Sequence, residues 1–233
     1  MWEETININE VREIRAKTTV YLGVGAIEKI GDIVSDLKAQ GINKMLVVTG
    51  RESFRKTGAW DYVLKAFEQN EIGYVLYSQV TPNPTVDQVD EAARMALDFR
   101  AQAVLTIGGG SPVDAAKAAA ILMKYPDKNA RELFEYKFTP DKAVPIVSIN
   151  LTHGTGTEVD RVAVVSIPEK QFKPAIAYDC IYPLYSIDDP ALMVTLPEDQ
   201  TVYVSVDALN HVVEAATTKV TSPFSILLAK EAI

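Results

Sequence analysis

The sequence is poor in cysteine, in histidine and in long apolar runs. Cys180 is the single cysteine among 233 residues, which excludes an intrachain disulfide framework and a cysteine-based zinc finger. No apolar run approaches the ~20 residues needed to span a bilayer. Met1–Arg15 alternates charge with isolated aliphatics and lacks the apolar core of a secretory signal. We therefore expect a cytoplasmic protein with no membrane span.

An excess of positive charge is also missing. The net charge is −8 and the isoelectric point is about 4.9, which argues against binding to nucleic acid or to an anionic membrane surface. An anionic cofactor would need local hydrogen-bond donors. The apolar fraction of 48% and the charged fraction of 23% are ordinary for a soluble globular enzyme. The length allows one large α/β domain, or one domain and part of another.

Apolar runs rich in β-branched residues alternate with segments of helical period over most of the chain. The expected strands span residues 18–22, 44–49, 74–77, 103–107 and 144–149. The expected helices span residues 27–37, 60–69, 86–98 and 113–123. This alternation predicts βαβ units with right-handed crossovers, and hence an α/β fold whose parallel sheet is covered on both faces. Residues 162–167 and 175–177 flank a charged turn and predict an antiparallel hairpin.

The pattern changes near Pro190, where we place a domain boundary. Residues 201–217 predict a helix, and 225–233 predict the start of another, with Ser222 as its cap. The apolar faces of these helices need a covering layer that the preceding segment is too short to supply. We therefore expect residues 1–190 to form the α/β domain and 191–233 to be the first helices of a truncated second domain. An uncovered apolar face also predicts a homodimer or a larger homo-oligomer.

A glycine-rich turn joins the strand at 103–107 to the helix at 113–123. Gly108–Asp114 reads GGGSPVD, and its glycines permit close approach of a ligand and positive φ. Ser111 is expected to cap the helix, with Pro112 in its first position. The free amides and positive end of the helix would then face a phosphate. The turn matches neither G-x-G-x-x-G nor the Walker A loop, and a purely structural tight turn is the alternative.

A second polar loop, Asn150–Glu158, directly follows the strand at 144–149. It would lie at the same carboxyl edge of the sheet, where ligands bind in doubly wound folds. Its threonine hydroxyls and glycine amides can hydrogen-bond ribose, phosphate or an amide. The alternative is a loop whose polar side chains satisfy one another.

Asp207 and His211 lie one turn apart on one face of the helix expected at 201–217. A carboxylate and an imidazole in that arrangement can bind one divalent cation, with Fe²⁺ or Zn²⁺ favoured. A simple carboxylate–histidine hydrogen bond is the alternative, because a catalytic metal site usually has at least three protein ligands. The other histidine, His153, lies in the polar loop.

Taken together and in this order, these motifs resemble those of the iron-containing (group III) alcohol dehydrogenases. The matching segments are PNPT at 82–85, GGGSPVDAAK at 108–117, GTGTE at 154–158, DPAL at 189–192 and DALNHVVE at 207–214. The resemblance implies a Rossmann-like, doubly wound domain followed by an all-helical metal-binding domain, with the active site between them. It also implies NAD(P)-linked interconversion of small alcohols and aldehydes or ketones.

The resemblance assigns contacts residue by residue. The residues that fall at the family's cofactor contacts are Asn83, Gly109, Gly110, Ser111, Asp114, Thr152, Thr155 and Lys173. Asp207 and His211 match its first two metal ligands, where the metal would hold the alcohol oxygen as a Lewis acid. The family's other two histidine ligands lie on later helices that this chain lacks, and His153 stands where the family often has a small residue. We therefore expect weak or absent metal binding and little or no activity from these 233 residues.

The choice between NADP and NAD can be argued from charge. A carboxylate after the second strand would bind the ribose 2′-hydroxyl and repel a 2′-phosphate. Here that strand ends at Gly50, and Arg51 or Arg55 can pair with a phosphate. Glu52 opposes this pairing. We expect NADP to be preferred, with Gly50 beside the adenosine ribose.

Two alternatives stay open. One is a related enzyme of the glycerol dehydrogenase or dehydroquinate synthase kind, which shares the sheet and the triple-glycine loop. The other is a non-catalytic dinucleotide-binding module. The GTGTE turn and the DALNHVVE helix favour the alcohol dehydrogenase branch.

Overall fold

A six-stranded parallel sheet forms the centre of the computed structural model, which describes residue 11 and residues 13–233. Its strands are β1 (Thr19–Leu22), β2 (Lys44–Thr49), β3 (Gly73–Tyr77), β4 (Ala103–Gly108), β5 (Ile146–Asn150) and β8 (Tyr185–Asp188). They lie in the order β1-β8-β5-β4-β2-β3, and each neighbouring pair is parallel. The expected parallel sheet is therefore confirmed. All of β4 and all but the first residue of β2 are buried, because both faces of the sheet are covered.

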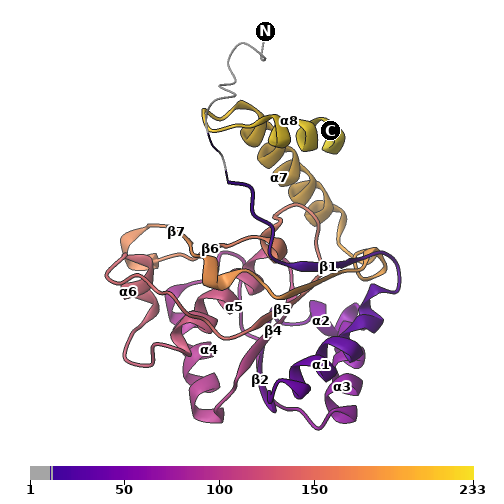
Figure 1. The fold of residues 1–233 in the computed structure, drawn as a ribbon, viewed down its shortest axis with the longest axis vertical. Coiled ribbons are helices and arrows are strands. Elements are labelled where there is room, and N and C mark those ends of the chain that lie inside the picture. The colour runs from indigo at the N-terminus through magenta and orange to yellow at the C-terminus, as the bar shows by residue number, and fades with distance from the viewer. Residues whose placement is uncertain (1–10, 12) are drawn as a thin grey trace.

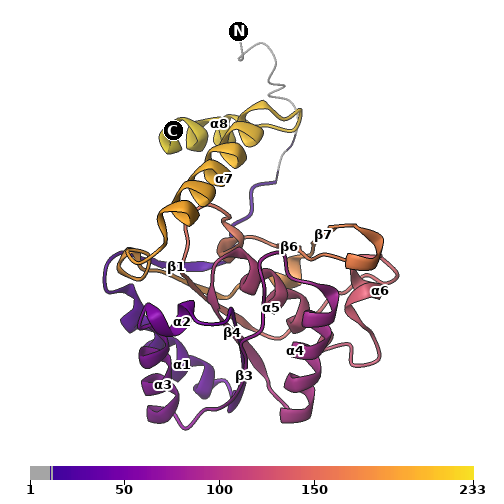
Figure 2. The same ribbon diagram turned by 180° about the vertical axis from the view of Figure 1, so that it is seen from behind.

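Helices cover the two faces of this sheet (Figures 1 and 2). One face packs against α1 (Ile30–Ala39), α2 (Ser53–Lys56) and α3 (Ala59–Gln69). The other packs against α4 (Val86–Phe99), α5 (Gly110–Leu122) and α6 (Ala130–Phe134). The two apolar clusters meet opposite faces because side chains alternate along each strand. The doubly wound, Rossmann-like architecture is confirmed.

The strand order creates a switch point between β2 and β4. The connection through α3 leads from β2 outward to β3, whereas the connection through α5 leads from β4 the opposite way to β5. Right-handed crossovers place these two connections on opposite faces of the sheet. A crevice therefore opens at the carboxyl ends of β2 and β4, where ligands bind in such folds.

The remaining elements differ in detail from the expectations. The hairpin of β6 (Val162–Val164) and β7 (Ala175–Ala177) is antiparallel, as expected, but shorter. The short elements α2, α6 and β8 were not expected. The first is a single turn, and Tyr-Ser-Ile-Asp in β8 is too short to show a period. Short 3₁₀ helices are η2 (Ala26–Lys29), η3 (Thr157–Val159), η4 (Pro168–Lys170), η5 (Asp179–Ile181) and η6 (Pro190–Leu192).

The last two helices, α7 (Glu198–Thr217) and α8 (Pro223–Ala232), pack on each other and project from the sheet (Figures 1 and 2). Ser222 caps α8 as expected, because its Oγ accepts a hydrogen bond from the Ser225 amide at 3.1 Å. No residue of α7 is buried. Its exposed apolar residues are Val202, Tyr203, Val206, Leu209 and Val213.

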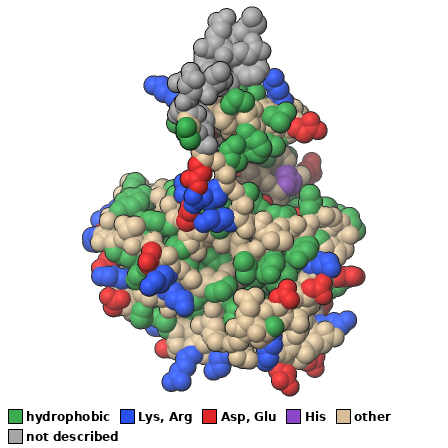
Figure 3. Space-filling model, in the orientation of Figure 1, with side chains coloured by type: hydrophobic (Ala, Val, Ile, Leu, Met, Phe, Trp, Pro, Cys, Tyr) green, Lys and Arg blue, Asp and Glu red, His purple; other side chains and the backbone are tan. Residues whose placement is uncertain are grey.

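Apolar side chains gather on the upper part of the molecule that α7 and α8 form (Figure 3). The apolar surface expected on these helices is therefore present and uncovered in this structure. No helix in the described part of the chain is long and apolar enough to cross a membrane.

Candidate functional site

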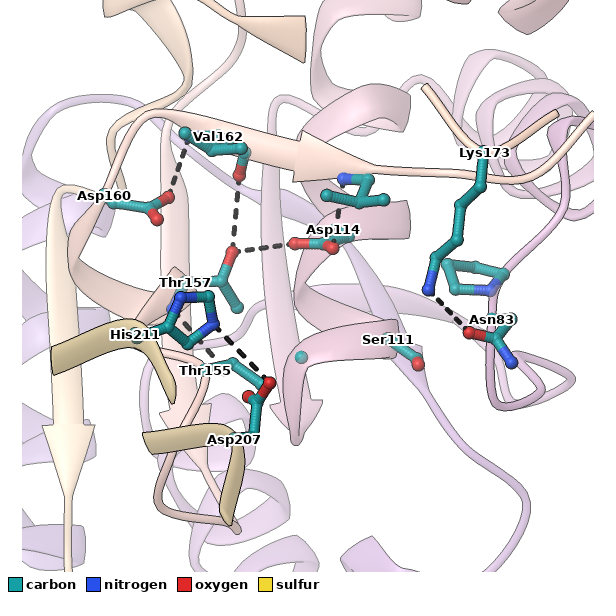
Figure 4. Close-up of a pocket in the computed structure, with 13 residues that line it drawn as sticks. Asn83, Ser111, Asp114, Thr155, Thr157, Asp160, Val162, Lys173, Asp207 and His211 are labelled. Atoms are coloured by element: carbon teal, nitrogen blue, oxygen red, sulfur yellow. Dashed lines mark hydrogen bonds and ion pairs between the residues drawn. The ribbon is translucent and has the colours of Figure 1, made fainter. Parts of the chain in front are cut away.

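A groove runs along the carboxyl edge of the sheet and consists of two adjoining pockets. The larger has a volume of about 660 Å³ and lies at the switch point, and the smaller has a volume of about 330 Å³. Gly110, Ser111 and Thr155 line both pockets, so the two are continuous. The other expected site residues lie in one pocket or the other: Gly50, Gly109 and Thr152 in the larger, and Asn83, Asp114, Lys173, Asp207 and His211 in the smaller (Figure 4).

Helix α5 begins at the junction of the two pockets. Its N-cap is Gly109, with φ −85° and ψ −159°, and no side chain caps it. The expectation that Ser111 caps this helix is wrong, because Gly110 is already helical and Ser111 lies within the first turn. Pro112 is tolerated there because first-turn amides have no intrahelical partner. The amides of this turn, together with the helix dipole, are suited to bind an anion.

The glycines of this turn are required for close packing. None of Gly108, Gly109 and Gly110 has a positive φ, so the left-handed freedom that glycine permits is not used at these positions. A Cβ on Gly109 would lie 2.6 Å from Thr152 Oγ1, and one on Gly110 would lie 2.9 Å from Thr155 Cγ2. The turn after β4 therefore packs directly against the loop after β5, and a larger residue would force the two apart.

A buried lysine lies below the smaller pocket, and the sequence reasoning missed it. Lys117 of α5 is fully buried. Its Nζ donates to Asp160 Oδ1 at 2.7 Å, to Thr157 Oγ1 at 2.9 Å and to the Val162 carbonyl at 2.8 Å. Burial lowers the pKa of Lys117, and the Asp160 carboxylate opposes that shift. The available signal was a lysine within the alanine-rich run DAAKAAA, on a helix with apolar residues on every side.

Asp114 belongs to the same network (Figure 4). Its Oδ1 accepts a hydrogen bond from Thr157 Oγ1 at 2.7 Å, and its Oδ2 accepts one from the Val164 amide at 3.0 Å. Burial raises the pKa of Asp114 to about 6, while Thr157 and Lys117 act in the opposite direction. Although Asp114 lines the smaller pocket, both carboxylate oxygens are bonded to the protein. Its contribution is to join α5 to the hairpin strand β6.

A cationic group lies at the rim of the smaller pocket. Lys173 Nζ donates to Asn83 Oδ1 at 2.7 Å, although the two residues are far apart in the sequence. Asn83 has a φ of 56°, a left-handed conformation that asparagine adopts more readily than most residues. The bend at Asn83 and the hairpin turn thus bring an ammonium group to a wall of the groove.

The arginines after β2 have different surroundings. Arg51 lines the larger pocket. Arg55 lies over the Phe54 ring at 4.4 Å and is not part of the pocket wall. Glu52, which also lines this pocket, pairs with Lys56 at 2.6 Å. Arg51 is therefore the arginine placed to meet an anion here, and Lys56 partly compensates the charge of Glu52.

Asp207 and His211 lie on one face of α7 and line the smaller pocket (Figure 4). His211 Nε2 is 3.6 Å from Asp207 Oδ1, which is longer than a hydrogen bond. The two side chains can therefore act as two ligands of one cation. Within the described residues, no group of three or more histidine, cysteine, aspartate or glutamate side chains is arranged to hold a metal ion.

The larger pocket also includes residues from the start of α7 and the segment before it, which the sequence reasoning missed. They are Leu196, Pro197, Gln200 and Val204. No periodicity identifies them, because their position depends on how α7 lies over the sheet edge. His153 is exposed, does not line the groove, and contacts α7 through Ser205.

Comparisons with known proteins agree with this geometry. The family model for iron-containing alcohol dehydrogenases matches residues 17–190. The chain is 59% identical over its whole length to long-chain primary alcohol dehydrogenase AdhA from Thermoanaerobacter ethanolicus, of which it covers 58%. It is 31% identical to an NADPH-dependent butanol dehydrogenase from Clostridium saccharobutylicum, with 92% of this chain and 54% of that protein aligned.

A solved structure has the same fold. The NADH-dependent butanol dehydrogenase A from Thermotoga maritima superposes with a TM-score of 0.88 at 35% identity, covering 95% of this chain and 55% of that one. The chain thus spans little more than half the length of the relatives that it matches. The motif order, the groove and the family match agree: this chain belongs to the iron-containing alcohol dehydrogenase family.

Proposed function

We propose that the chain binds a nicotinamide dinucleotide in the groove, and that the whole protein interconverts small alcohols and aldehydes or ketones by hydride transfer with the help of iron. One observation carries this proposal. A continuous groove joins the uncapped start of α5 at the switch point to Asp207 and His211. A dinucleotide extended along it would have its pyrophosphate at α5 and its nicotinamide beside these two residues.

The groove is suited to a dinucleotide in chemistry as well as in place. The first-turn amides of α5 can bind the pyrophosphate, since an uncapped helix N-terminus favours anions. Gly109 and Gly110 leave no side chain between those amides and the ligand. The hydroxyls of Thr152 and Thr155 and the ammonium group of Lys173 add donors along the walls. These local donors offset the overall charge of −8.

The metal site is supported less completely. Asp207 and His211 would supply a carboxylate and an imidazole, which suit Fe²⁺ or Zn²⁺. When bound, the metal would polarise the alcohol oxygen as a Lewis acid. A catalytic metal usually needs at least three protein ligands, and this pair supplies two. The residues of this chain therefore support nucleotide binding directly, and catalysis is proposed for the whole protein.

We further propose that NADP is preferred to NAD. The relatives do not decide this, because one is named for NADPH and another for NADH. The argument rests on Gly50, which leaves room beside the ribose, and on Arg51, which lines the larger pocket. A guanidinium group can pair with a 2′-phosphate through two hydrogen bonds.

Binding can be tested by titrating the chain with NADPH and with NADH and following the nicotinamide fluorescence. We expect both to bind, NADPH more tightly. Ser111→Asp should weaken binding by about ten-fold or more, because it places a negative charge beside the pyrophosphate, although it favours the helix itself. Ser225→Asp, in the first turn of α8, is the matched control. The proposal fails if the wild-type chain binds neither nucleotide, or if Ser111→Asp binds as the wild type does.

The uncovered face of α7 leads us to propose self-association into a dimer or larger oligomer. Light scattering during gel filtration should show more than one chain per particle. Replacing Val206 and Leu209 with glutamine should reduce that mass, and a wild-type monomer would contradict the proposal.

The division into domains at residue 190 and the cytoplasmic location also remain proposals.

A further inference from the structure

The loop after β5 touches α7 at two adjacent places. His153 Nε2 and Ser205 Oγ share a hydrogen bond of 2.9 Å. Next to it, Gly154 lies so close to the helix that a Cβ would be 2.3 Å from the Val204 carbonyl oxygen. Gly154 also has a φ of 118°, so a residue with a side chain would be strained there. We call these four residues (His153, Gly154, Val204 and Ser205) the loop–helix contact.

Both partners of the loop–helix contact form walls of the groove. On the loop side, Thr152 and Thr155 flank the contact and line the larger pocket. On the helix side, Gln200 and Val204 line the same pocket. The contact therefore determines how far apart two walls of the nucleotide pocket lie. Asp207 follows Ser205 closely on α7, so the orientation of that residue depends on the same contact.

Among the described residues, helix α7 makes few other contacts with the elements of the sheet domain. No residue of α7 is buried, so apolar packing contributes little to its position. A helix with so little burial is expected to move relative to its neighbours. Under these conditions a single hydrogen bond and one close backbone contact can have a measurable effect on where the helix lies.

We propose that His153 is a positioning residue: by bonding Ser205 beside the close approach of Gly154, it holds α7 against the nucleotide-binding loop. It touches neither nucleotide nor metal in this role. The proposal rests on the proposed function only for the identity of the ligand. Its physical basis is an equilibrium between a docked and an undocked α7. A net side-chain hydrogen bond shifts such an equilibrium by about five-fold.

The first test measures the contact without any ligand. Hydrogen–deuterium exchange of residues 151–156 would be compared among the wild type, His153→Ala, Ser205→Ala and the double variant. Each single substitution should speed exchange of this loop by up to about five-fold. The double variant should be no faster than either single one, because both remove the same bond. His153→Gln should restore slow exchange, since its amide nitrogen can take the place of Nε2.

Two controls distinguish a positioning role of His153 from a general effect on the stability of the fold. The urea midpoint of the sheet domain should be unchanged in all variants, because the side chains of His153 and Ser205 are exposed. Val213→Ala, farther along α7, should leave loop exchange at the wild-type rate. Additive effects of the two single substitutions, an unchanged rate in His153→Ala, or no restoration by His153→Gln would each overturn the proposal.

The second test uses NADPH. Because apparent affinity falls with the docked fraction, His153→Ala and Ser205→Ala should each weaken binding by up to about five-fold. For each variant, the factor by which binding weakens and the factor by which exchange accelerates should multiply to about five. The two substitutions should again not be additive, and His153→Gln should bind as the wild type does. Unchanged affinity together with exchange that accelerates by less than about two-fold would overturn the positioning role. If the wild type binds no nicotinamide nucleotide, the proposed function fails. The exchange experiment alone then shows whether His153 holds α7 against the loop.

Discussion

The ammonium group of Lys117 lies 2.7 Å from the carboxylate of Asp160, and no part of the Lys117 side chain is exposed to solvent. Lys117 belongs to α5, whose first turn meets the groove, and Asp160 precedes the hairpin strand β6. The pair therefore connects two parts of the groove. One is α5, which we propose to bind pyrophosphate, and the other is the segment of Asp160, which lines the smaller pocket. We infer that Lys117 anchors α5 to this segment.

Replacing Lys117 with methionine should destabilise the fold by about 2–4 kcal/mol, because the Thr157 hydroxyl and the Val162 carbonyl each lose a buried donor. Asp160 is 41% exposed and can regain water, which keeps the loss towards the lower value. Urea unfolding measures the change. Lys124→Met, an exposed lysine just after the same helix, should have little effect. Equal stability of the two variants would contradict the anchoring role.

Glu158 should make the fold less stable at neutral pH and above than in acid. Its Oε2 is buried without a hydrogen-bond partner, and burial raises its pKa to about 7, with Asp188 and Asp160 adding to the shift. Because this pKa exceeds the unfolded value of 4.5, the folded state binds the proton more tightly. The associated stability is present below about pH 4.5 and is lost as the pH rises through about 7.

Glu158→Gln tests this linkage. Relative to the wild type, the variant should gain stability between about pH 5 and pH 8, since glutamine stays neutral. The difference in unfolding free energy is obtained from urea titrations at both pH values. Glu68→Gln, on the exposed surface of α3, should show no such trend. A pH-independent difference for Glu158→Gln would show that this carboxyl group does not carry the effect.

Gly109→Ala should disturb the junction of the two pockets. Its Cβ would lie 2.6 Å from Thr152 Oγ1, so we expect a loss of about 1–3 kcal/mol from overpacking. Thr152→Ala in the same chain should recover part of that loss by removing the two clashing atoms, Oγ1 and Cγ2. Gly31→Ala in α1, where a Cβ meets nothing within 4 Å, should instead stabilise by about 0.5–1 kcal/mol. Thermal unfolding of all four proteins distinguishes steric crowding from a general intolerance of alanine.

Gly50→Asp should move nucleotide preference from NADP towards NAD. The new carboxylate would accept hydrogen bonds from the ribose 2′-hydroxyl and repel a 2′-phosphate. The substitution is sterically mild, because a Cβ at Gly50 would lie 3.7 Å from its nearest neighbour, the Val80 carbonyl oxygen. Fluorescence titration gives both dissociation constants, and the value for NADH divided by the value for NADPH should fall by about ten-fold or more. An unchanged ratio would place the ribose elsewhere.

This chain should bind metal only weakly. Asp207 and His211 offer two ligands, and the described residues contain no larger cluster. We expect iron or zinc to be lost on dialysis, as metal analysis of the dialysed chain would show. His211→Ala should retain no less metal than the wild type under these conditions. Stoichiometric metal in the wild type, lost in His211→Ala, would show that the site is complete without further ligands in this chain.

The buried interior of the fold was largely readable from local pattern. KMLVVT predicted a strand buried on both faces, and Lys44–Thr49 forms β2 as expected. Four of the six helices that cover the sheet (α1, α3, α4 and α5) follow the expected periods within a few residues. The strand β8 was missed, because Tyr185–Asp188 is short and its burial comes from lying between β1 and β5. Local pattern cannot show where a strand is inserted.

The DPAL segment shows a similar limit. The sequence marked it as a family motif without a physical reason. In the structure, the Asp189 carboxylate accepts hydrogen bonds from the Gly25 and Ile27 amides, at 3.0 and 3.1 Å, at the start of η2. It thus joins the end of β8 to the turn after β1. A contact across so many residues cannot be read from spacing.

For this protein, the sequence by itself determined where the longer strands and helices lie, which turn is rich in glycine, and which residue types could meet a cofactor or a metal. These properties follow from periodicity and local backbone chemistry, which act over a few residues. Only the tertiary structure decided that the two loops pack against each other, that Lys117 bonds Asp160, and that His153 meets Ser205 on α7. The reason is physical: distances between segments far apart in the chain are determined by how the layers pack, and no local pattern encodes them.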